Sequence, residues 1–80
     1  MTNETAWRVI QVAFRTAAEL QGLLPFLKQN CNEEEYKNYS LGVATAIDSI
    51  NVELTKRVLS SHPEFERQIE SDIAAFGRIV

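Results

Sequence analysis

The segment over 33–60 constrains the fold most, because its apolar residues recur at spacings of three, four and seven. Such spacing places them on one face of an α-helix, which turns every 3.6 residues. Asn32 precedes the segment, and Glu35 follows three residues later, as in a capping box. Glutamates at 33–35 and basic residues at 56–57 suit the helix dipole. We therefore predict a helix over 33–60 whose inner face is formed by Tyr36, Val43, Ile47, Ile50, Leu54 and Val58.

The first quarter of the chain also has helical periodicity. Apolar residues form a broad arc around Ile10, and charged residues lie opposite, which predicts a helix over 4–21. Gly22 and Pro25 then interrupt the pattern, because Gly commonly follows a helix end and Pro suits the first turn of a new helix. Two alternatives remain open: a separate short helical turn over 24–29, or a single first helix kinked near Gly22.

A third helix is predicted over 63–78. Pro63 suits the first turn of a helix, and it biases His62 away from helical angles. The apolar face of this helix carries Phe65, Ile69, Ile73, Phe76 and Val80. Because no segment alternates like a strand, the expected fold class is all-α. We predict one domain over 1–80, a small three-helix bundle with an optional extra turn near Pro25, in which the helix over 33–60 is longest and central.

The size of the chain limits how stable its core can be. A domain of 80 residues buries only roughly 60–65% of the surface of its unfolded chain, and its core supplies a net ~3–5 kcal/mol. A single cysteine, Cys31, excludes an internal disulfide. With one histidine, His62, it makes a poor metal-ligand set, so we expect neither metal nor cofactor. Self-association remains as a source of additional stability.

Charge and hydropathy argue against two classes of partner. The net charge is −3, and Lys56-Arg57 is the only pair of adjacent basic residues, so we expect no nucleic-acid binding. The longest apolar stretch, over 23–27, is too short to cross a bilayer, and the first twenty residues lack the apolar core of a signal peptide. With an unpaired cysteine, these features predict a soluble, cytoplasmic protein that binds no membrane.

Two residues on the 33–60 helix stand out. Gly42 costs ~1 kcal/mol relative to Ala inside a helix, so we interpret it as a point where a neighbouring helix approaches closely. Asn51 lies near the apolar face, and we interpret it as a polar residue that sets helix register rather than as a ligand.

A second apolar stripe runs beside the main face of this helix. It contains Leu41, Val52 and Leu59, and Thr45 and Asp48 lie among them. One interpretation is that the stripe packs on a neighbouring helix of the same chain. The other is that these five residues form an interface with a partner.

No motif in the sequence specifies a reaction. We therefore predict a non-catalytic module that binds another protein or itself, with a homodimer as the expected form. The alternative is a small ligand-binding protein or enzyme with an interhelical pocket near Asp48, Tyr39 and His62. The two hypotheses differ in one structural respect, because the second requires these three side chains to converge.

Overall fold

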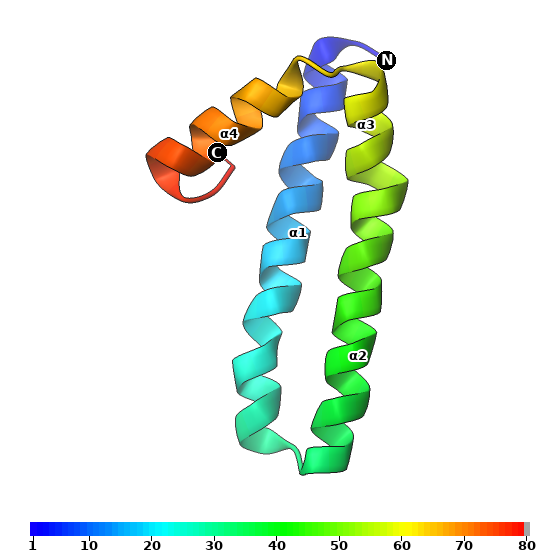
Figure 1. Cartoon of the computed structure of the whole chain (residues 1–80), viewed down its shortest axis with the longest axis vertical. Helices are drawn as coiled ribbons and strands as arrows, with labels where there is room; N and C mark the ends of the chain where they lie inside the picture. Colours follow the sequence, from blue (N-terminus) through cyan, green and yellow to red (C-terminus); the bar gives the residue numbers. More distant parts are fainter. Residues whose placement is uncertain (80) are drawn as a thin grey trace.

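The computed structural model describes residues 1–79 and contains helices joined by short turns (Figure 1). The first helix and the next three helical segments form a long antiparallel hairpin, and the last helix packs beside one end of it. In these residues no strand occurs, so the predicted all-α class is confirmed. In order, the elements are α1 (Asn3–Asn30), α2 (Glu33–Ile50), the π-helix η1 (Asn51–Thr55), α3 (Lys56–Ser61) and α4 (Phe65–Phe76).

The first helix is longer than its sequence pattern predicts. α1 runs as one helix to Asn30, in agreement with the alternative of a single first helix, and the predicted end near residue 21 and the separate turn over 24–29 are wrong. Pro25 lies inside α1, although it has no N–H to donate to the Gln21 carbonyl. The helix continues because α1 packs along α2, and tertiary contacts of this kind outweigh weak local preferences.

The second arm of the hairpin begins as predicted. The Glu35 N–H donates to Asn32 Oδ1 over 2.8 Å, and the Asn32 N–H donates to Glu35 Oε1 over 3.0 Å, which completes the capping box. From there α2, η1 and α3 follow without a break, so the long helix predicted over 33–60 is present. The expected close approach at Gly42 is wrong, because a Cβ built there meets no atom within 4 Å.

The π-helical turn η1 changes which residues face inward. Each i→i+5 bond takes one more residue into the turn than an α-helical bond does. The inner face consequently shifts by about one position: Thr55 is buried, whereas Leu54 is 42% exposed. The sequence pattern had predicted Leu54 on the inner face, because it assumed an uninterrupted α-helical period.

The last helix begins at Phe65 rather than at Pro63, and the Phe65 N–H donates to the His62 carbonyl over 3.1 Å. The Phe65 ring meets Trp7 of α1 edge-on, with ring centroids 5.2 Å apart, and His62 stacks on it. The helix ends at Gly77, whose φ of 72° is a left-handed conformation that glycine adopts without steric cost.

The core lies at one end of the hairpin, which we call the closed end: residues 3–13 of α1, the segment 55–61, and α4. Its buried cluster consists of Ala6, Ile10, Val58, Phe65 and Ile69. Here α1 lies between α4 and the second arm of the hairpin, so α1 occupies the middle position that the sequence had led us to expect for the 33–60 helix (Figure 1). Val80, predicted on the apolar face of the last helix, lies outside the described residues.

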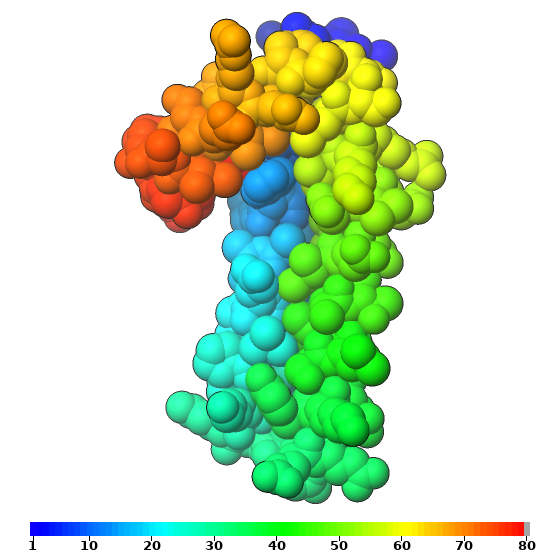
Figure 2. Space-filling view, in the orientation of Figure 1, coloured from blue at the N-terminus to red at the C-terminus, as the bar shows by residue number. Residues whose placement is uncertain are grey.

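The remainder of the hairpin, residues 14–50, has only two helices, and we call it the open end. Figure 2 shows that α4 covers the upper part of the hairpin and leaves the lower part without a third helix. Val43, at 7% exposed, is the single buried apolar residue among residues 14–50. The open end therefore presents side chains that a third helix would normally cover.

Candidate binding groove

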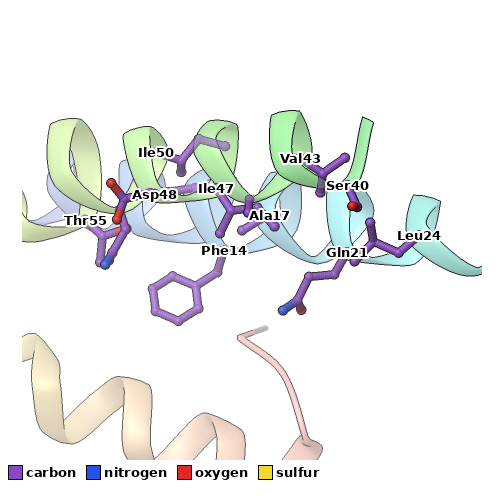
Figure 3. Close-up of a pocket in the computed structure, with 13 residues that line it drawn as sticks. Phe14, Ala17, Gln21, Leu24, Ser40, Val43, Ile47, Asp48, Ile50 and Thr55 are labelled. Carbon is purple, nitrogen blue, oxygen red and sulfur yellow. The ribbon is translucent and has the colours of Figure 1, made fainter. Parts of the chain in front are cut away.

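A groove of about 470 Å³ runs between the two arms of the hairpin, from Ala13 and Thr55 at the edge of the closed end into the open end. The side chains that line it come from α1, α2 and η1, and Figure 3 shows Phe14 and Gln21 of α1 projecting toward the C-terminal turn. The groove lies on the side that faces the C-terminal turn after α4. Its lining consists of Ala13, Phe14, Ala17, Gln21, Leu24, Ser40, Val43, Ala44, Ile47, Asp48, Ile50, Asn51 and Thr55.

The sequence creates this groove by alternating small and large residues. Ala13 and Ala17 on α1, and Ala44 on α2, leave space where longer side chains would fill it. Phe14 and Ile47 are only half-buried and form apolar walls. Such a mostly apolar concavity with a few polar groups is the usual character of a binding site.

The polar groups of the groove are few and mostly uncharged. Asp48 is the one charged side chain in the lining, and it is exposed. Ser40 is turned toward its own helix, because its hydroxyl donates to the Lys37 carbonyl over 3.1 Å. Gln21 projects from α1 toward the C-terminal turn (Figure 3). An occupant of this groove would thus meet an apolar floor with one negative charge at its edge.

The structure separates the five predicted interface residues into three groups. Asp48 lines the groove. Leu41 and Val52 are 68% and 40% exposed, so they do not pack inside the chain, and Thr45 is exposed with its hydroxyl bonded to the Leu41 carbonyl. Leu59 is half-buried against the core cluster. The interpretation of the stripe as core had predicted such packing for Leu41 and Val52 as well. That a partner covers the exposed members stays a prediction.

The three residues of the enzyme alternative are not brought together. Tyr39 and His62 are absent from the lining of the groove, whereas Asp48 belongs to it. Along the helix axis, Asp48 is about 13 Å from Tyr39 and about 21 Å from His62. His62 instead stacks on Phe65 at the closed end, and its Nδ1 lies 3.6 Å from a Glu64 carboxylate oxygen. This arrangement provides no shared pocket for these side chains.

Residues 1–79 hold no group of three or more His, Cys, Asp or Glu side chains placed to bind a metal. Over the same residues, no helix is long and apolar enough to cross a membrane.

Among the described residues, two polar side chains are buried that the sequence did not predict to be so: Thr55, described above, and Asp72. Asp72 of α4 is only 5% exposed, and its Oδ1 accepts from Gln68 Nε2 over 2.8 Å. The sequence could have indicated this burial, because Asp72 lies one helical turn from Ile69, on the flank of the apolar face. The sequence analysis also did not predict that alanines shape the groove, since small residues on an apolar helix face are typical of a core.

Comparisons with known proteins identified no relative of this chain. No protein-family model matches the chain, and no curated protein or solved structure is similar enough to it to count as a match.

Proposed function

We propose that this protein is a helical interaction module that forms a homodimer through the open end of its hairpin. The observation that carries this proposal is the uncovered groove: its floor and walls are largely apolar, and no helix of the chain lies over it. At the closed end, α4 supplies the third helix that completes the core. At the open end, a second copy of the chain would supply it.

The exposed area of the chain supports self-association. A folded monomer of 9.1 kDa is expected to expose roughly 4,900 Å². This chain exposes 5984 Å². The excess of roughly 1,100 Å² is similar to the ~800 Å² that each partner buries in a protein–protein interface of standard size. The excess surface is thus sufficient for a dimer interface.

The exposed apolar residues point to the same conclusion. Besides the groove, Leu41, Phe26 and Phe76 are each more than half exposed. Burial of apolar surface contributes about 25 cal/mol per Å², so covering such residues would add stability that a small core lacks. A cytoplasmic location is proposed with this function, because the single thiol of Cys31 suits a reducing compartment.

Sedimentation velocity over a range of protein concentrations tests the proposal. We expect a monomer–dimer equilibrium for the unaltered chain. Ala44→Glu places a charge in the groove at an exposed helical position, so it should weaken the dimer at least tenfold without loss of helicity. Ser49→Glu is the matched control, because Ser49 is exposed on the same helix outside the groove. A chain that stays monomeric at millimolar concentration would contradict the proposal.

A further inference from the structure

The end of α4 carries an apolar surface that its own chain covers only in part, although Ile79, just after the helix, packs on the core. Phe65 and Ile69, at the start of the helix, are buried in the core, whereas Ile73 and Phe76 on the same face are 45% and 61% exposed. Figure 1 shows the reason: α4 leaves the hairpin at an angle, so its C-terminal end stands away from α2. The second half of this amphipathic face therefore has no partner helix.

The chain thus contains two unpartnered apolar features, the groove at the open end and the exposed end of α4. The groove is a concave surface between two helices. At the end of α4, Ile73 and Phe76 lie one helical turn apart, and Ile73 also borders a second hollow against α1. A helix that lays residues at this spacing into an apolar groove is a common mode of recognition.

The charges of the two features are complementary. Asp48 is the one charged side chain in the lining of the groove. In the segment 71–79, Arg78 is the one exposed charged side chain, because Asp72 is buried. An apolar contact between these surfaces would therefore bring one positive and one negative charge to its edge, which favours this pairing over others.

We propose that Ile73 and Phe76 of one copy contact the groove of a second copy, with Arg78 beside the second copy's Asp48, and that the contact is reciprocal. The proposal rests on the homodimer proposed above and names the segments that form it. A dimer of this kind has twofold symmetry, so each contact occurs twice. Both exposed apolar features of each chain are covered at once.

The obvious competing dimer packs groove against groove. That arrangement places two copies of the same negative groove in one interface, and the like charges of the two Asp48 carboxylates would repel each other. It also leaves Ile73 and Phe76 uncovered. The reciprocal arrangement has neither defect.

Charge reversal tests the pairing. Asp48→Arg and Arg78→Glu should each weaken the homodimer about tenfold at low salt, because each turns two attractive contacts into repulsive ones. An equimolar mixture of the two variants should dimerise to within about threefold of the unaltered chain, since both contacts of the mixed dimer are again attractive. Arg67→Glu, an exposed charge reversal on the same helix, is the matched control and should change dimerisation less than twofold. Sedimentation velocity measures the unaltered chain, the three variants and the mixture, and circular dichroism confirms that each is helical.

The outcomes of this experiment distinguish failure of the homodimer from failure of the proposed contact through α4. If the unaltered chain dimerises but Arg78→Glu has no effect, the homodimer stands and the role of α4 is wrong. Disruption by Asp48→Arg without disruption by Arg78→Glu would place the groove in the interface but rule out Arg78 as the partner of Asp48. If the unaltered chain is a monomer, both proposals fail. Recovery of the dimer in the mixture, with both single variants impaired, supports the reciprocal contact.

Discussion

The closed and open ends of the hairpin are built from the same two helices and differ in one element, α4. At the closed end, three helices meet, and Ala6 and Ile10 are completely buried. At the open end, two helices meet, and residues on the same faces, such as Leu24 and Ile47, are only half-buried. A pair of helices has one contact line, so most of each apolar arc stays exposed until a third element covers it.

The difference shows that helix length and core size are separate properties of this chain. The two arms extend far beyond the region that α4 covers, so the hairpin has more apolar surface than the chain can bury alone. Four predictions test or refine this contrast, in decreasing order of expected effect.

The largest effect is expected for Ile10→Ala at the closed end. Ile10 is fully buried, so its truncation should cost about 2–5 kcal/mol of unfolding free energy. The same change at half-buried Ile47 of the open end should cost only about 1 kcal/mol. Urea unfolding followed by circular dichroism, at a protein concentration where the chain is monomeric, measures both. Equal losses of unfolding free energy would mean that the two ends contribute equally to stability, which would contradict the difference between the closed and open ends.

Asn32→Ala breaks the capping box at the turn of the open end and should cost about 1 kcal/mol, because the Glu35 N–H loses its acceptor, Asn32 Oδ1. Asn38→Ala is the control, since Asn38 is exposed within the same helix. Urea unfolding together with amide hydrogen exchange would show whether the loss is global. A loss of exchange protection confined to the open end would show that the two ends unfold separately.

Gly42→Ala should stabilise the chain by about 0.5–1 kcal/mol, because alanine is the better helix former and its Cβ would meet nothing. Gly77→Ala should instead destabilise it, since φ at Gly77 is 72°. Thermal unfolding of both variants measures the contrast. A decrease in melting temperature for Gly42→Ala would reveal a neighbour packed on this part of the open end, which would place the dimer contact there.

The smallest effect is expected for Glu53→Gln, at the boundary between the two ends. Glu53 and Arg57 form an ion pair of 2.7 Å, but their side chains are 60% and 72% exposed. Exposed pairs of this kind contribute about 0.5 kcal/mol or less, and salt screens them. The loss in unfolding free energy should therefore be within about 0.5 kcal/mol and should vanish at 1 M salt. A larger loss would indicate that charge, as well as the missing third helix, distinguishes the two ends.

The candidate groove could be predicted only in part. The interface prediction included Asp48, because an isolated carboxylate beside an apolar stripe is visible in the sequence. The alanines and Phe14, which shape the groove, looked like core, because periodicity identifies the inner face of a helix but not whether another element covers it. For the same reason, Ile73 and Phe76 were expected in the core and are exposed.

The sequence by itself determined the helices, the cap at Asn32 and the turn before Phe65, because apolar periodicity, capping hydrogen bonds and the constraint of Pro63 act within a few residues. Only the tertiary structure decided that α1 continues through Pro25, that η1 turns Thr55 inward in place of Leu54, and that α4 covers one end alone. These outcomes depend on how elements distant in sequence pack against one another, and no local preference encodes that packing.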